Sequence, residues 1–362
     1  VYCASALSAG GQLFESVFGI DYHVALTIGA LVVLVYTFLG GFTAVCVTDF
    51  IQGMLMLVGI LAVPLFAYHF LTTGGTTLSA GLEASGADSA NFLNLMKNGD
   101  GSNNIVSVIS GLGWGLGYFG VPQVLLRFMA IRHEDELKRS RRIATVWVLI
   151  SLSIAVFIGL VGRTLYPTAL TTSSDAENVF ILLSTNLLPP LIAGFVMAGI
   201  LAATISSSDS YLLIAASAFA KNIYQGLFRK KASDREVLNI SRITLLLIAV
   251  VAIIIALDEN SVIFTIVSFA WAGFGATFGP LMLFSLFWKR TTRAGAIAGM
   301  LGGAGMVFVW NLLVRPLGGL WDIYELLPAF LFSCLCIIVV SLLTPQPSEQ
   351  IQREFEEVKA GR

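Results

Sequence analysis

Runs of apolar residues separated by short polar stretches occur ten times along this chain of 362 residues. About 20 consecutive apolar residues span the hydrocarbon core of a bilayer as one helix, and most of these runs reach or approach that length. The pattern therefore predicts an all-α polytopic membrane protein with about ten transmembrane segments. The predicted helices cover residues 1–19, 22–39, 44–71, 105–130, 143–166, 188–222, 238–257, 261–288, 294–314 and 325–344.

Two polar stretches lie between these predicted helices. Residues 73–104 are rich in Gly and Ser and are too hydrophilic to cross a membrane. Residues 175–187 form a shorter amphipathic piece in another link. We expect both stretches to lie outside the bilayer on its external side.

The distribution of basic residues predicts an orientation. Most of the 21 lysines and arginines fall in the links after the fourth, sixth and eighth runs and in the tail. The positive-inside rule places these links in the cytoplasm. We therefore expect a multi-pass protein of the inner or plasma membrane, with a transmembrane transporter domain over 1–344 and a cytoplasmic tail over 345–362.

Composition agrees with this class and excludes others. Charged residues make up 12% of the chain, against roughly 25% in soluble domains. The net charge of −1 gives no reason to expect a nucleic-acid partner. The four cysteines and three histidines are scattered without metal-ligand spacing, and we find no nucleophile–base pair and no phosphate loop. We therefore expect that the protein is not an enzyme.

The sixth apolar run carries the sequence SSSDS at its centre, starting at Ser206. The carboxylate of Asp209 at that depth costs a few kcal/mol on insertion scales and by default indicates a functional site. Helical spacing places Ala203, Ser206, Ser207 and Ser210 on one side. Their hydroxyls, and backbone carbonyls if the helix loosens, are ligands that a small hard cation accepts in place of water. Helix packing through small residues is the alternative explanation.

The fourth run contains five glycines between positions 111 and 120, followed by Pro122, and this combination predicts a broken helix. Interrupted helices near the midplane mark binding sites in transporters. Trp114, Tyr118 and Pro122 recur every four residues and would share a face suited to a small amphipathic solute. A glycine-rich packing helix is the alternative, whereas a nucleotide-binding loop fails because no strand precedes the glycines.

A second carboxylate, Asp49, lies several residues inside the third apolar run. A charge facing lipid at that depth is costly, so we expect Asp49 to face the interior of the helix bundle. A single functional site would then join Asp49 to the face that runs from Ser206 to Ser210. An interfacial acid near the cytoplasmic end of the helix is the alternative.

These stretches together resemble the sodium/solute symporter family, most closely its sodium/proline symporters. WGLGYFG-x-P is fairly specific to the proline branch, while the GGF…TD and GILAA…S strings mark the wider family. The resemblance covers essentially the whole chain. The matching strings are YCASALSAGGQLFES (2–16), YTFLGGFTAVCVTD (36–49), WGLGYFGVP (114–122), RFMA (127–130), AGILAATISSSDS (198–210) and FAWAGFGATFGPLMLFSLFWKR (269–290).

The resemblance implies a five-plus-five inverted-repeat transporter core. In this family the entry of sodium drives uptake of a solute, here a small amino acid and most closely L-proline. One sodium site of the family maps to the carbonyl of Ala203 and the hydroxyls of Ser206 and Ser207. The partners implied are therefore sodium, a small-molecule solute and the lipid bilayer.

Further functional positions are implied by the same resemblance. Solute contacts of the proline branch map to Trp114, Tyr118 and Pro122. In some members an aspartate that maps to Asp49 forms a second cation site with hydroxyls of the later helix, here those of Ser206 and Ser210. Asp209 matches a variant found in part of the family.

One departure from the family pattern concerns the start of the chain. The first apolar run matches the fourth transmembrane segment of the family, so the core lacks its first helices in this sequence. We therefore expect the transporter domain to be incomplete at its N-terminus and the isolated chain not to transport.

Two alternative functions stay open at this point. A sodium-coupled carrier of another small organic solute would keep the mechanism and change the cargo. A membrane sensor would bind solute without moving it. Solute accumulation in vesicles, measured with and without a sodium gradient, separates a transporter from a sensor.

Overall fold

The computed structural model describes residues 1–39, 42–170, 172–258 and 263–360, and these are helical over most of their length. The described residues of the ten apolar runs lie mainly on helices, which confirms the all-α prediction, and residues 261 and 262 of the eighth run lie outside the described residues. Among the described residues, seven helices are long and apolar enough to cross a membrane. The other three runs lie in shorter apolar stretches, namely α1 Tyr2–Phe18, the portion Tyr22–Val35 of α2, and Ile105–Phe119.

The chain forms two compact units, each described here by itself. The first unit contains residues Val1–Ser89 and Arg132–Val267, and the second contains Ala90–Ile131 and Ser268–Arg362. The chain passes between the units at three points, after Ser89, after Ile131 and after Val267, and helices α5 (Ser89–Phe92) and α13 (Ile263–Phe287) cross the first and the last of them.

The other elements divide between the two units. Those of the first are α1, α2 (Tyr22–Leu39), α3 (Phe42–Thr73), α4 (Leu78–Ala84), α8 (Glu136–Leu165), α9 (Ser173–Glu177), α10 (Val179–Leu187), α11 (Pro190–Ala218), the π-helix η2 (Phe219–Phe228) and α12 (Asp234–Ile255). Those of the second are α6 (Ile105–Gly113), the 3-10 helix η1 (Trp114–Phe119), α7 (Pro122–Met129), α14 (Arg293–Val309), the short turns η3 (Trp310–Val314), η4 (Arg315–Leu317) and η5 (Gly319–Asp322), α15 (Leu326–Leu343) and α16 (Glu349–Lys359).

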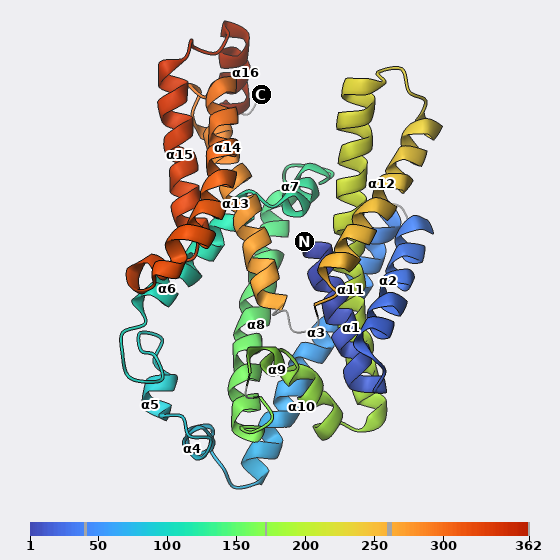
Figure 1. The fold of residues 1–362 in the computed structure, drawn as a ribbon, viewed down its shortest axis with the longest axis vertical. Helices are drawn as coiled ribbons and strands as arrows, with labels where there is room; N and C mark the ends of the chain where they lie inside the picture. Colours follow the sequence, from blue (N-terminus) through green and yellow to red (C-terminus); the bar gives the residue numbers. More distant parts are fainter. Residues whose placement is uncertain (40–41, 171, 259–262, 361–362) are drawn as a thin grey trace. The chain divides into compact units, whose positions relative to one another are not determined.

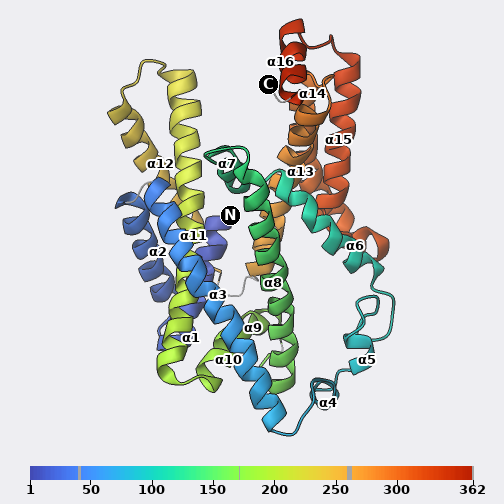
Figure 2. The same ribbon diagram turned by 180° about the vertical axis from the view of Figure 1, so that it is seen from behind.

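Helix α11 is the common element of the first unit, and both ribbon views show it among its neighbours (Figures 1 and 2). Its Leu212 and Ala216 belong to an apolar cluster with α1, α2 and α12. Its Ala193 and Val196 belong to a second cluster with α3, α8 and α10. Burial of these apolar faces fixes α11 between two groups of helices, so the polar residues at its centre lie inside the unit.

In the second unit, α14 and α15 form an antiparallel hairpin, side by side in Figures 1 and 2. Glycines at four-residue spacing, Gly295, Gly299 and Gly303, are all buried on α14. A Cβ at Gly299 would overlap the side chain of Ile337, and the Ser333 hydroxyl donates to the Gly299 carbonyl at 2.9 Å. Small residues thus let the two backbones approach, as they do at helix interfaces in membranes.

Replacing Gly299 with Ala is therefore expected to loosen this hairpin. The added methyl group must displace Ile337, and overpacking of this kind costs about 1–3 kcal/mol. Gly305 on the same helix has open space around its Cβ position, so Gly305→Ala is the matched control. We expect a lower thermal unfolding temperature in detergent for Gly299→Ala only. Equal unfolding temperatures for both variants would contradict this packing.

The fourth apolar run is interrupted as predicted. Helix α6 ends at Gly113, the 3-10 helix η1 follows, and Val121 is extended with φ −79 and ψ 116 before Pro122 begins α7. The glycines have a structural role, because a Cβ at Gly117 would overlap the indole of Trp271. A Cβ at Gly120 would lie 2.7 Å from the Gly279 nitrogen. The break therefore lets η1 pack directly against α13.

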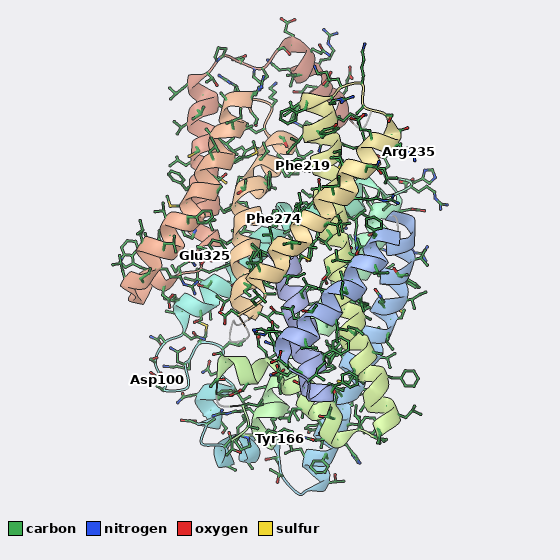
Figure 3. The ribbon with its side chains drawn as sticks, turned by 45° about the vertical axis from the view of Figure 1, so that its right-hand side comes forward. Asp100, Tyr166, Phe219, Arg235, Phe274 and Glu325 are labelled. Atoms are coloured by element: carbon green, nitrogen blue, oxygen red, sulfur yellow. The ribbon has the colours of Figure 1, made fainter. Side chains whose placement is uncertain are left out.

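The polar links contain short helices that the apolar pattern does not predict. Residues 73–104 include α4 and α5, and the tail contains α16. Within residues 73–104, Asp100 (Figure 3) accepts a hydrogen bond from the Ser102 hydroxyl at 2.6 Å and another from the Ser102 backbone N–H at 2.9 Å. These bonds hold the pKa of Asp100 below its ordinary value, so the turn loses them only as the pH falls through that lowered pKa.

Candidate functional site

The candidate cation ligands of α11 lie on one half-buried face. The helix is continuous from Pro190 to Ala218, and neither Gly nor Pro occurs after Gly199, so a loosened helix is not found here. The Ala203 carbonyl therefore accepts the N–H four residues later in the helical ladder. It also accepts the Ser206 hydroxyl at 3.1 Å, which brings two predicted ligands into contact. Ser207 is half-buried on the same helix.

The structure brings Asp49 of α3 to this helix. The Ser210 hydroxyl donates to Asp49 Oδ2 at 3.5 Å, although the two residues are 161 positions apart. Asp49 is half-buried. The two helices pack closely at Gly199, where a Cβ would make an ordinary van der Waals contact with Leu55 of α3 at 3.7 Å. A carboxylate and several hydroxyls thus line one contact between two helices.

The contact between Ser210 and Asp49 is too long for a strong hydrogen bond, and its oxygens suit a hard cation. A donor–acceptor distance of 3.5 Å is at the long limit of hydrogen bonding, so little energy is lost when both oxygens turn to a cation. Carboxylate, hydroxyl and carbonyl oxygens are the ligands that hard cations prefer. The face therefore has the donor set that a sodium site requires.

Asp209 is buried differently from its neighbour Ser210. Both Ser208 and Asp209 are fully buried, whereas Ser210 is half-buried. Positions three and seven residues after Asp209 are Leu212 and Ala216, which pack against α1, α2 and α12. Successive helical residues point about 100° apart, so Asp209 does not share the direction of Ser210. A cation role for Asp209 stays a prediction.

The candidate solute contacts lie in the second unit and gather around Trp271 of α13. Its indole N–H donates to the Trp114 carbonyl at 2.9 Å, and the two indoles stack with centroids 5.6 Å apart. The ring of Tyr118 meets Trp271 edge to face at 4.8 Å. Trp271 itself is buried, whereas Tyr118 is 43% exposed.

The reason for this gathering differs from the predicted one. Four-residue spacing gives a shared face only on an α-helix, and Trp114–Phe119 is a 3-10 helix with about three residues per turn. Trp271 brings Trp114 and Tyr118 together instead. Pro122 lies beyond the extended Val121, as the first residue of α7, and is half-buried.

Two members of this aromatic cluster were not identified as site residues from the sequence. Trp271 lies in the string FAWAGFG, whose small residues signal close packing. Tyr324 stacks on Trp114 at 5.5 Å, but it lies in a short link between helices that carries no periodic signal.

Comparisons with known proteins agree with the pattern of the sequence. Residues 1–303 match the Sodium:solute symporter family. The high-affinity proline transporter PutP of Bacillus subtilis (strain 168) is 41% identical over 357 residues, covering 98% of this chain and 73% of that protein. The osmoregulated proline transporter OpuE of the same organism is 40% identical over 355 residues, covering 98% and 70%. A sodium/proline symporter of Staphylococcus aureus is 40% identical over 365 residues, covering 99% and 70%.

A solved structure shares the fold. It is the substrate-bound outward-open state of a Na⁺-coupled sialic acid symporter, with a TM-score of 0.75 over 96% of this chain and 72% of that chain. The two sequences are only 19% identical, so this likeness concerns the fold alone. It confirms the predicted all-α fold class.

Proposed function

This chain belongs to the sodium:solute symporter family, and from that premise we propose that it couples sodium entry to the uptake of proline. It is a multi-pass membrane transporter and not an enzyme. The observation that carries the proposal is its 41% identity to a high-affinity proline transporter over nearly the whole chain. The half-buried oxygen ligands of α11 and the aromatic cluster of α13 and η1 support it chemically.

We assign two cation positions within this function. Ala203, Ser206 and Ser207 supply one carbonyl and two hydroxyls for the first. Asp49 and Ser210 form the second, with Asp209 as a further candidate. The support is the 3.1 Å contact from Ser206 to Ala203 and the 3.5 Å contact from Ser210 to Asp49. A carboxylate in a half-buried position is stabilised when a cation neutralises it, so sodium binding offsets its burial.

The solute contacts are assigned to Trp114, Tyr118 and Pro122. Proline combines an apolar pyrrolidine ring with an ammonium and a carboxylate. Aromatic rings offer apolar area to the ring and attract an ammonium by about 0.5–2 kcal/mol. The hydroxyl of Tyr118, a residue that is 43% exposed, adds a hydrogen-bonding group, since tyrosine both donates and accepts.

The same proposal includes an orientation. The tail over 345–362 lies in the cytoplasm, together with the basic links before α8, α12 and α14. The support is the concentration of lysine and arginine in these links, which the positive-inside rule associates with the cytoplasmic side.

Because the isolated chain is expected not to transport, uptake of radiolabelled proline by cells that express this chain within its full-length protein tests the coupling. We expect accumulation when sodium is outside and loss of accumulation when choline replaces sodium. Cells carrying an empty vector give the background. Sodium-dependent binding of proline to isolated membranes without accumulation would instead indicate a sensor, and absence of both would reject proline as the solute.

A further inference from the structure

Tyr324 lies beside the candidate solute contact Trp114 without belonging to the interrupted helix. It is 6% exposed and follows the turn η5, just before α15. Its ring stacks on the Trp114 indole with centroids 5.5 Å apart and planes 18° apart. Trp114 also stacks on Trp271 at 5.6 Å and 16°. The Trp114 ring is therefore oriented by two nearly parallel aromatic neighbours.

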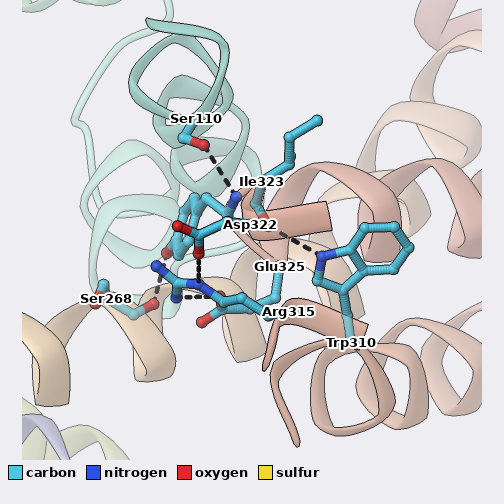
Figure 4. Close-up of polar contacts among 8 residues, drawn as sticks. Ser110, Ser268, Trp310, Arg315, Asp322, Ile323 and Glu325 are labelled. Atoms are coloured by element: carbon cyan, nitrogen blue, oxygen red, sulfur yellow. Dashed lines mark hydrogen bonds and ion pairs between the residues drawn. The ribbon is translucent and has the colours of Figure 1, made fainter. Parts of the chain in front are cut away.

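Polar contacts fix Tyr324 to α6 and α13, and Figure 4 labels its partners Ser110 and Ser268. Its hydroxyl donates to the Ser268 carbonyl of α13 at 2.5 Å. Its backbone N–H donates to the Ser110 hydroxyl of α6 at 3.0 Å. Burial and the neighbouring Glu325 carboxylate raise the pKa of Tyr324, so the phenol stays protonated and keeps donating. One residue thus links α6, which ends just before Trp114, to the helix of Trp271.

An ion-pair group holds the turn that presents Tyr324. Arg315 contacts Glu325 Oε2 at 3.0 Å and Asp322 Oδ1 at 2.9 Å, and Glu325 is only 1% exposed (Figure 4). The Trp310 indole N–H donates to the Ile323 carbonyl at 2.9 Å. Both residues that flank Tyr324 are therefore anchored, and a buried carboxylate paired in this way resists displacement.

We propose that Tyr324 is a positioning residue that sets solute affinity by orienting the Trp114 indole. The inference rests on the proposed function of Trp114 as a solute contact. Binding groups must be held close to their productive geometry by neighbours that are themselves locked. Tyr324 meets this condition because its ring contacts Trp114 while its hydroxyl and backbone bind α13 and α6. The α14–α15 link thereby influences a site to which it contributes no solute contact.

Substitutions at Tyr324 test the proposal through a split between affinity and rate. Tyr324→Leu removes the stacked ring and is expected to raise the KM for proline about three- to tenfold, the size of an aromatic pair contribution. Tyr324→Phe keeps the ring and loses only the hydrogen bond to Ser268. We therefore expect its KM to lie between that of the parent protein and that of Tyr324→Leu. The maximal rate and the sodium requirement stay within about twofold of the parent. Phe330→Leu, a buried aromatic of α15 that packs on Gly279, is the matched control with an unchanged KM.

A spectroscopic measurement separates this inference from the proposed function. The contribution of Trp114 to the near-ultraviolet circular dichroism is obtained by subtracting the spectrum of Trp114→Phe. We expect this contribution to shrink in the Tyr324→Leu background and to persist in Phe330→Leu. The measurement needs no solute, so a shrunken contribution supports positioning even if proline is not the cargo. An unchanged Trp114 contribution in Tyr324→Leu, or a normal KM in a protein that takes up proline, overturns the proposal.

Discussion

Replacing Asp49 with Asn is expected to raise the sodium concentration for half-maximal proline uptake by about tenfold or more, which requires the loss of only ~1.4 kcal/mol. The amide keeps the shape and one oxygen but removes the negative charge. Even at an effective dielectric constant of about 20, two unit charges at ~4 Å attract by about 4 kcal/mol. Sodium titrations of uptake at fixed proline, corrected for the amount of protein in the membrane, measure this shift.

Asp209→Asn is the matched control, because it makes the same chemical change at the residue before Ser210. The Ser210 hydroxyl contacts Asp49 at 3.5 Å, while Asp209 is fully buried and points in a different direction from Ser210 on α11. We therefore expect a mild effect from Asp209→Asn. A larger sodium defect from Asp209→Asn than from Asp49→Asn would show that the second cation position has been assigned to the wrong carboxylate.

Replacing Trp114 with Ala is expected to weaken proline affinity by about tenfold or more while sodium activation changes little. Burial of a large apolar side chain contributes about 1.5–3 kcal/mol, and the variant loses this contact surface with the pyrrolidine ring of proline. It also loses the attraction between the indole ring and the ammonium group of proline. Proline titrations at saturating sodium and sodium titrations at saturating proline separate the two effects.

Trp288→Ala provides the comparison, since Trp288 lies at the end of α13 and packs edge to face on Phe284 at 5.5 Å. Trp288→Ala should change neither the proline titration nor the sodium titration. If Trp114→Ala reduced both affinities equally, or neither, the residue would have a packing role rather than a place in the solute site.

The sequence predicts the helices of this protein well because membrane insertion makes hydrophobic length decisive. It also predicts the break before Pro122, since five glycines and a proline disfavour a regular helix. The pairing of Asp49 with Ser210 could be anticipated because an isolated carboxylate at membrane depth needs an interior partner.

Other features depend on tertiary contacts and could not be predicted. The 3-10 conformation of η1 follows from close packing of Gly117 on Trp271, which no local pattern encodes. The continuity of α11 depends on apolar clusters on two of its sides, whereas the sequence left open whether this helix loosens at its serines. Tyr324 reaches Trp114 from about 200 residues away, so only the folded chain reveals the contact.

The most direct test of sodium-coupled proline transport is the current that follows addition of proline to membranes, on a solid support, that contain the full-length protein. Proline is a zwitterion without net charge near pH 7, so its movement alone carries no current. We predict an inward positive current when sodium is present and none when choline replaces it, with the sodium dependence shifted in Asp49→Asn. Proline uptake without any current in sodium, or an equal current in choline, would contradict coupling to sodium.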